Sequence, residues 1–188
     1  PAPIILALML NEIRAGLYKK LSQTILYLPH FLSWVIIGGL VTTLFATTSG
    51  LINKGLTSIG LPAVPWLSDN GWWIFMYVFV TVWQGIGWGA IVYLSAITGI
   101  DQEMYEAAKV DGCSRFKMMT KITLPSIRTT IVIMLILRVG GMMSIGFEKP
   151  QMLKNVMVNE VGDVISTFIY RYGIENNKFA ISTAGGLL

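Results

Sequence analysis

The chain has 188 residues, of which 54% are hydrophobic and only 13% are charged, whereas an ordinary soluble domain carries roughly 25% charged residues. This composition excludes a typical water-soluble globular domain and indicates a membrane protein. The formal net charge of +4 does not indicate nucleic-acid binding, because the Lys and Arg residues lie in short clusters between apolar runs and form no extended basic face.

Apolar runs that match the length of a membrane crossing are the main organising feature, since a transmembrane helix needs about 20 mostly apolar residues. We expect complete spans at 24–47, 72–98 and 127–147, and partial spans at 1–10 and 179–188. The chain begins and stops inside apolar runs, so we expect one transmembrane domain that is truncated at both ends. The predicted fold class is an all-α, polytopic membrane helix bundle.

The first complete span is interrupted by Pro29 and His30. Because proline removes a backbone donor, we expect a bent or late-starting helix whose secure part is Phe31–Ala46. With no second imidazole in the chain, His30 is better explained as a packed residue at a helix end than as a ligand. The segment 48–71 is rich in Gly and Pro, which predicts a loop with a short helix around Ile52–Ile59.

The second and third spans differ in the residues that they would bury. Span 72–98 opens with two tryptophans and contains three glycines, which predicts an interfacial aromatic belt and close helix contacts. Span 127–147 contains the charged residue Arg138, and an intramembrane charge faces a cavity or a partner. Two hypotheses stay open: Arg138 faces the translocation path or an intersubunit contact, or it pairs with backbone carbonyls or a neighbouring subunit for assembly alone.

The positive charges predict the orientation of the spans. The segments 11–24 and 99–128 carry eight Lys and Arg residues, whereas 48–71 and 148–178 carry five. By the positive-inside rule, 11–24 and the loop 99–126 are cytoplasmic, and 48–71 and 148–178 are external. Within the last of these segments, a helix is possible at Val161–Tyr172.

The loop 99–126 carries the strongest pattern in the chain. Residues Glu103–Val110 are good helix formers, with Met104, Ala107 and Ala108 spaced to share one small apolar face. Asp111 and Gly112 stop this helix, because glycine tolerates the positive φ of a C-terminal cap. Ser114 is placed to cap a second helix, with Phe116, Met119 and Ile122 on one face, that closes at Leu124-Pro125. Pro125 would then lie in the first turn of the following span.

The same loop matches the pattern E-A-A, three residues, G, nine residues, I-x-L-P, formed by Glu106, Ala107, Ala108, Gly112, Ile122, Leu124 and Pro125. It resembles the cytoplasmic loop of permease subunits of binding-protein-dependent ATP-binding-cassette importers. The runs YLPHFLSWVIIGGL, YLSAITGID, SIGFEKP and VGDVISTFIYRYG extend the resemblance over nearly the whole chain. They are similar to the subgroup that imports oligosaccharides and polysaccharide fragments. The sequence departs from the commonest version of the motif at Cys113, where a small alanine is frequent.

The resemblance implies a type I importer fold in a bacterial plasma (inner) membrane, with a coupling helix that inserts into a cleft of the ATPase. The site residues would then be the seven motif residues and Asp111. The implied partners are ABC ATPase subunits that hold ATP and Mg, a second permease that forms a heterodimer with this chain, and an extracytoplasmic solute-binding protein. No cofactor is expected in this chain itself.

The sequence lacks the residues that are characteristic of other functional classes. The complete spans contain no Asp or Glu, which an ion-coupled secondary carrier would use as proton or cation sites. There is no phosphate-binding loop of the G-x4-G-K-[ST] type, so ATP hydrolysis needs a separate subunit. There is also no metalloprotease or hydrolase motif. A secondary carrier is the alternative function, followed by a membrane enzyme.

Overall fold

The computed structural model describes residues 1–13, 16–142, 146–175, 178–180 and 183, and within these ranges the regular structure is entirely helical. The longest helix, α5 (Asn70–Thr98), has 29 residues and is by itself long and apolar enough to cross a membrane. The number of such spans rises to three if each of two bent helix pairs is counted as one. The all-helical fold class predicted from the sequence is therefore confirmed.

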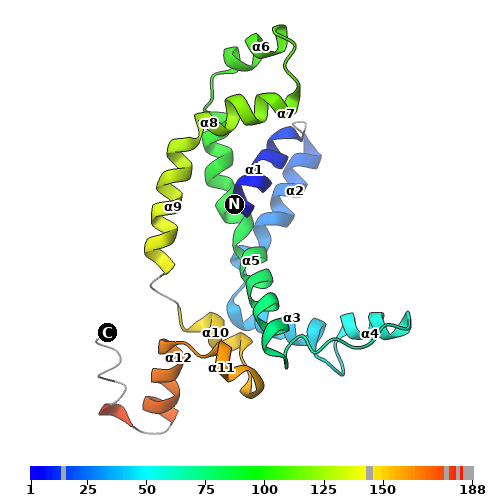
Figure 1. The fold of residues 1–188 in the computed structure, drawn as a ribbon, viewed down its shortest axis with the longest axis vertical. Helices are drawn as coiled ribbons and strands as arrows, with labels where there is room; N and C mark the ends of the chain where they lie inside the picture. The colour runs from blue at the N-terminus through cyan, green and yellow to red at the C-terminus, as the bar shows by residue number, and fades with distance from the viewer. Residues whose placement is uncertain (14–15, 143–145, 176–177, 181–182, 184–188) are drawn as a thin grey trace. The chain divides into compact units, whose positions relative to one another are not determined.

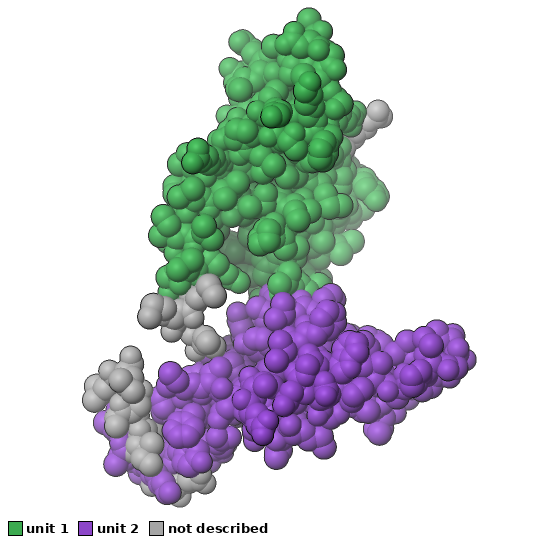
Figure 2. Space-filling model, in the orientation of Figure 1, with its two compact units in different colours: residues 1–31, 82–143 green, residues 32–81, 144–188 purple. Residues whose placement is uncertain are grey.

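The chain divides into two compact units, which are coloured separately in Figure 2. Unit 1 comprises residues 1–31 and 82–143, and unit 2 comprises residues 32–81 and 144–188. The helix α5 contributes its first part to unit 2 and its remainder to unit 1. The helix α5 is therefore common to both units.

Unit 1 is a bundle around the later part of α5 (Figure 1). Its other helices are α1 (Ala2–Glu12), α2 (Leu17–Tyr27), η1 (Leu28–Phe31), α6 (Gln102–Val110), α7 (Arg115–Met118), η2 (Met119–Thr123), α8 (Leu124–Ser126) and α9 (Arg128–Met142). Its core consists of Ala7, Leu8, Leu10, Ala90, Tyr93, Leu94, Ile97, Ile100 and Ile127. The backbone of α2 approaches α5 so closely at Gly87 that any Cβ there would overlap the carbonyl group of Leu26. This contact accounts for a glycine within the span.

Unit 2 surrounds the first part of α5. Its other helices are α3 (Trp34–Phe45), α4 (Leu51–Ser58), α10 (Glu148–Leu153), η3 (Val156–Val158), α11 (Asn159–Gly162), α12 (Ile165–Ile169) and η4 (Tyr170–Glu175). Its core consists of Trp34, Ile37, Val41, Trp73, Met76, Val80, Leu153 and Val158. We call Phe147–Glu175 the C-terminal segment; it is fixed to α5 by the Trp73 indole, which donates a hydrogen bond of 2.9 Å to the carbonyl of Leu153.

A single buried amide organises the region between α3 and α5. Asn53 is 2% exposed, and its side chain donates to the carbonyls of Thr47 and Val64 at 3.0 and 2.8 Å. Its carbonyl oxygen accepts from the backbone N–H of Val64 and from the indole of Trp66 at 3.1 and 3.0 Å. Because every polar atom of this side chain has a partner, its burial fixes the loop on either side of α4 without a desolvation penalty. The predicted short helix at Ile52–Ile59 is confirmed as α4.

The run 24–47 contains a break, in agreement with the bent or late-starting helix expected there. The run 24–47 is not one helix, because α2 and η1 end at Phe31 and α3 starts afresh at Trp34. The break follows from Ser33, which has an extended backbone and whose hydroxyl accepts a hydrogen bond from the N–H of Ile36, as an N-terminal cap does. The helix α2 also begins at Leu17, inside the predicted loop 11–24.

The helix expected at Val161–Tyr172 is also divided. The helix α11 ends at Gly162, Asp163 and Val164 are extended, and α12 begins at Ile165. Asp163 bonds instead to the side chains of Lys154 and Thr167, which compete with a continuous helix. The span 72–98 is confirmed by α5, and 127–147 is represented by α9 over the described residues. Most of the predicted partial span 179–188 lies outside the described residues.

Candidate functional site

The first helix of the 101–126 loop (Asp101–Ser126) is defined at both ends by its own sequence. The Asp101 carboxylate accepts a hydrogen bond of 3.0 Å from the N–H of Glu103 and caps the start of α6. At the other end Gly112 has a φ of 72°. The N–H groups of Gly112 and Cys113 bond to the carbonyls of Lys109 and Ala108 at 3.0 and 2.9 Å. This pair of bonds forms a Schellman motif, which confirms the predicted stop at Gly112.

The second helix begins as expected and continues further than expected. The Ser114 hydroxyl accepts from the N–H of Lys117 at 3.4 Å, which confirms the predicted cap. The helix does not close at Leu124-Pro125, because α7 passes through the π-helical turn η2 into α8 and ends at Ser126. In this wider turn the N–H of Leu124 bonds to the carbonyl of Met119. The chain bends by 62° between this helix and α9, after Pro125 and not before it.

The two helices of the loop are held together by a hydrogen bond that the motif does not contain. The Tyr105 hydroxyl lies 2.8 Å from the hydroxyl of Thr123, which is 3% exposed. Ala108, on the same face of α6 as Tyr105, is buried as well. Met119, Ile122 and Leu124 pack against the core of unit 1, to which α5 contributes Ala90, Tyr93, Leu94 and Ile97, and so attach the second helix to the bundle. The loop is therefore a small helical hairpin on one end of this unit (Figure 1).

Five of the motif residues face away from this packing. Glu106, Ala107, Asp111, Gly112 and Pro125 are exposed, whereas Ile122 and Leu124 are half-buried. The predicted apolar face of α6 is thus divided, because Ala108 packs inward while Ala107 and Met104 stay in solvent. The structure therefore separates an outer set of motif residues from an inner set that anchors the loop.

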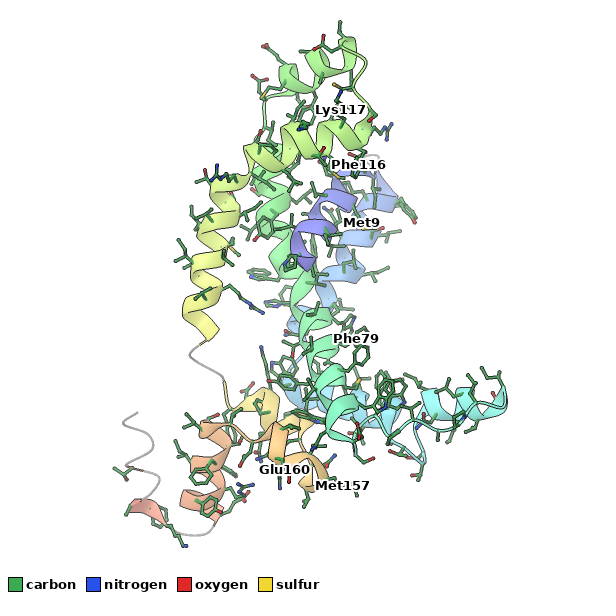
Figure 3. The ribbon with its side chains drawn as sticks, viewed as in Figure 1. Met9, Phe79, Phe116, Lys117, Met157 and Glu160 are labelled. Atoms are coloured by element: carbon green, nitrogen blue, oxygen red, sulfur yellow. The ribbon has the colours of Figure 1, made fainter. Side chains whose placement is uncertain are left out.

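Large apolar side chains lie on the exposed surface of the loop. Val110 is 88% exposed, Phe116 is 70% exposed and Met104 is 47% exposed. Phe116 and Lys117 leave α7 in different directions in Figure 3, and Phe116 does not join Met119 and Ile122 in the core. Large apolar side chains left exposed on a polar loop between two spans are candidates for contact with another protein. We call Met104, Ala107, Val110 and Phe116 the apolar surface of the loop.

Some residues of the site were missed by the sequence analysis. Tyr105 and Thr123 are two such residues. Their hydrogen bond joins two helices that are 18 positions apart in the sequence, so it becomes visible only when the tertiary structure is known. From the sequence, Val110 is one of the helix formers of Glu103–Val110, and Phe116 shares a helix face with Met119 and Ile122. The apolar character of both was visible in the sequence, but their exposure depends on which face of each helix the core covers.

Arg138 lies in α9 of unit 1, ten residues after Arg128. It is exposed, and no ion pair or hydrogen bond connects it to any residue that the structure describes. Acidic side chains are absent from α9 itself. The described ranges also contain no group of three or more His, Cys, Asp or Glu residues arranged to hold a metal ion.

The C-terminal segment contains a further charged cluster in unit 2. Lys154 and Arg171 both pair with Asp163, at 3.0 Å for the lysine, and Thr167 donates a 2.6 Å hydrogen bond to the same carboxylate. Burial alone would raise the pKa of Asp163, but the hydrogen bonds from Thr167 and Lys154 and the charges of Lys154 and Arg171 outweigh it and lower this pKa. Asp163 is therefore a charged structural anchor.

Comparison with known proteins gives a consistent result. Residues 1–147 match the family model of the binding-protein-dependent transport system inner membrane component. The chain is 42% identical to the polygalacturonan/rhamnogalacturonan transport system permease protein YteP of Bacillus subtilis, and 43% identical to Protein LplB of the same organism. Both alignments cover all of this chain, but only 58% and 59% of those proteins.

Solved structures agree with these sequence matches. A bacterial ABC transporter involved in the import of the acidic polysaccharide alginate has a chain that is 44% identical, with a TM-score of 0.92 over all of this chain and 65% of that one. The alginate transporter in complex with an alginate pentasaccharide-bound periplasmic protein gives a TM-score of 0.91. This chain thus spans about three fifths of the length of its relatives.

Proposed function

Since the chain belongs to the family of inner membrane components of binding-protein-dependent transport systems, we propose that it is the permease subunit of an ATP-driven importer. The 101–126 loop would be its contact with the ATPase. The observation that carries this role is the exposed apolar surface of the loop, most of it on α6, a helix that is bonded to the second helix of the loop through Tyr105. Membership in the family of the membrane component agrees with the prediction that the chain is not itself the ATPase.

The construction of the loop is suited to passing a movement to the spans. The helix α6 follows α5 after three residues, Gly99–Asp101, and the second helix leads into α9 after Ile127. The Tyr105–Thr123 hydrogen bond connects the two helices, so a displacement of α6 acts on α5 and α9 together. ATP and Mg would be bound by the partner, and this chain would contribute the surface that follows its closure.

The contact itself follows from side-chain size and charge. Ala107 has only a methyl group, so a partner can approach the backbone of α6 closely at this position. Glu106 beside it is exposed and free to pair with a basic group of the ATPase. Val110 and Phe116 would lose their water contact on docking, which favours association. Asp111 and Gly112 would end α6 at the rim of the contact.

The substrate class that best fits the relatives is an oligosaccharide from an acidic polysaccharide. YteP is named for polygalacturonan and rhamnogalacturonan, and the matched solved transporter is involved in alginate import. Galacturonan and alginate are both polymers of uronic acids, so each repeating unit carries a carboxylate. This chain would import fragments of such a polymer, with a second permease subunit and an external solute-binding protein as further partners.

Replacing Ala107 by Trp tests the coupling role. The large side chain would hold the ATPase away from α6, so uptake by the assembled transporter in proteoliposomes should fall at least tenfold, with the loss of substrate-stimulated ATP hydrolysis. Gln102→Trp is a matched control, because Gln102 is exposed on the first turn of the same helix. Normal uptake by A107W at normal subunit levels would rule out the proposed contact.

The energy source separates the importer from a secondary carrier. Vanadate should stop uptake by the wild-type transporter, while an uncoupler that abolishes the proton gradient should leave uptake intact in proteoliposomes supplied with ATP. The opposite pattern would contradict the importer function.

A further inference from the structure

Arg138 is aligned in α9 with two residues that pack against the core of unit 1. It follows Ile131 and Met134 at intervals of seven and four residues, which places all three on one side of a helix. Ile131 and Met134 pack against the core of unit 1, which includes Ala90 and Leu94 of α5. Most of the exposed apolar residues of α9 lie on its other sides: Val132, Ile133, Ile136, Leu137 and Val139. Arg138 is exposed as well, but its position continues the line of Ile131 and Met134 along the helix.

The depth of Arg138 in the membrane limits its partners. At a rise of about 1.5 Å per residue, it lies about 15 Å along α9 from Arg128. If Arg128 marks the cytoplasmic boundary, this distance is about half of the hydrocarbon core of roughly 30 Å. Snorkelling to lipid headgroups serves residues near the ends of a span, so a lipid phosphate is a poor partner for Arg138. A charge at this depth needs an anion or a polar cavity on the side of the bundle.

We infer that Arg138 binds the carboxylate groups of uronic acid units as an acidic oligosaccharide passes along the bundle face of α9. This inference rests on the proposed function and specifies the chemistry that it would use. A guanidinium group offers a planar pair of donors that fits a carboxylate, and its charge persists at every physiological pH. Because it carries no partner among the described residues, Arg138 is available to a passing ligand.

The glycines after Arg138 are consistent with such a path. Gly140 and Gly141 have no atom within 4 Å of the position that a Cβ would occupy, so they are not required for close packing within the described residues. Their small size leaves the surface next to Arg138 unobstructed. A saccharide unit, which is wider than a peptide side chain, needs such room beside the charged group that holds it.

The test measures selectivity in the complete transporter, assembled with its partner subunits in proteoliposomes. Uptake of an oligogalacturonide is compared with uptake of a neutral oligosaccharide of the same length, for the wild type, Arg138→Gln and Arg138→Lys. We expect R138Q to raise the KM for the acidic substrate about tenfold or more, as for the loss of a charge-assisted hydrogen bond. Neutral uptake should be unchanged, and R138K should recover part of the acidic uptake because it keeps the charge.

The control is Arg128→Gln, which removes the same charge at the start of the same helix. It should leave the ratio of acidic to neutral uptake unchanged. An unaltered ratio of acidic to neutral uptake in R138Q would overturn the inference. An equal fall in the uptake of both substrates, or a loss of assembled subunits, would also overturn it and would indicate an assembly contact. A wild-type transporter that takes up neutral but not acidic substrates would overturn the inference and the proposed substrate class. Absence of any vanadate-sensitive uptake in the wild type would instead overturn the proposed function.

Discussion

The 101–126 loop and the C-terminal segment consist of similar short helices, but different contacts stabilise them. In the loop, both helices are defined by nearby residues, through the caps at Asp101 and Ser114 and the positive φ of Gly112. The C-terminal segment depends on residues far away in the sequence, such as Trp73, which bonds to Leu153. The 101–126 loop, whose helices are defined by local contacts, can move as one piece without losing its shape. The C-terminal segment is instead fixed to its surroundings.

Removing the charge of Asp163 should produce the largest effect and would test the fixed character of the C-terminal segment. Asp163→Asn leaves Lys154, whose side chain is 11% exposed, and Arg171 close together without an anion. We expect a loss of about 3 kcal/mol in the free energy of unfolding. Thermal unfolding in detergent measures it. Glu160→Gln, which changes an exposed carboxylate of the same segment (Figure 3), should have almost no effect.

The same carboxylate predicts that the stability of the C-terminal segment depends on pH. The pKa of Asp163 is lowered in the folded protein, so its contribution to stability is complete above the ordinary pKa of an unfolded aspartate, about 4. The contribution is lost as the pH falls below that value and through the lowered pKa. Hydrogen exchange of residues 154–172, measured relative to the intrinsic exchange rate at each pH, should accelerate below about pH 4 in the wild type. In D163N this acceleration should be absent; its persistence would assign the dependence to another group.

Gly112 tests whether the 101–126 loop depends on its local backbone conformation. Gly112→Val places a β-branched residue at a φ of 72°, which we expect to destabilise the turn by about 1–2 kcal/mol. Uptake and substrate-stimulated ATP hydrolysis should fall together, while the unfolding temperature of the rest of the protein stays nearly constant. Gly112→Asn should be milder, since asparagine tolerates this conformation. Equal activity for both variants and the wild type would show that the turn is not needed.

Tyr105→Phe tests the hydrogen bond between the two helices of the loop. It leaves the buried Thr123 hydroxyl without its partner, at an expected cost of about 1 kcal/mol. The coupling between ATP hydrolysis and uptake, measured as sugar transported per ATP, should decrease. Tyr18→Phe is the matched control because Tyr18 is 74% exposed. If the ratio is unchanged in Y105F, the helices move together by packing alone.

The smallest effect is expected for the ion pair between the loop and α1. Arg115 lies 3.5 Å from Glu12, but their side chains are 76% and 45% exposed. Arg115→Gln should therefore change stability by less than about 0.5 kcal/mol. A larger loss, measured by thermal unfolding at low and high salt, would mean that the loop is more firmly attached than its local contacts indicate.

The sequence by itself determined the features that depend on neighbouring residues. An apolar run of sufficient length predicted α5, and glycine and serine at fixed intervals predicted the end of α6 and the start of α7. The family was also identifiable, because the motif residues in the loop have a fixed spacing. These features share one physical reason: a backbone conformation, or a hydrogen bond within one helical turn, involves only residues that are close together in the sequence.

The tertiary structure decided what depends on residues far apart. It divided the run 24–47 at Ser33, buried Asn53 among Thr47, Val64 and Trp66, and broke the expected helix near Asp163. It also exposed Val110 and Phe116 while burying Ala108. Helical periodicity places residues on a common face, but only the position of the neighbouring helices decides which face is covered.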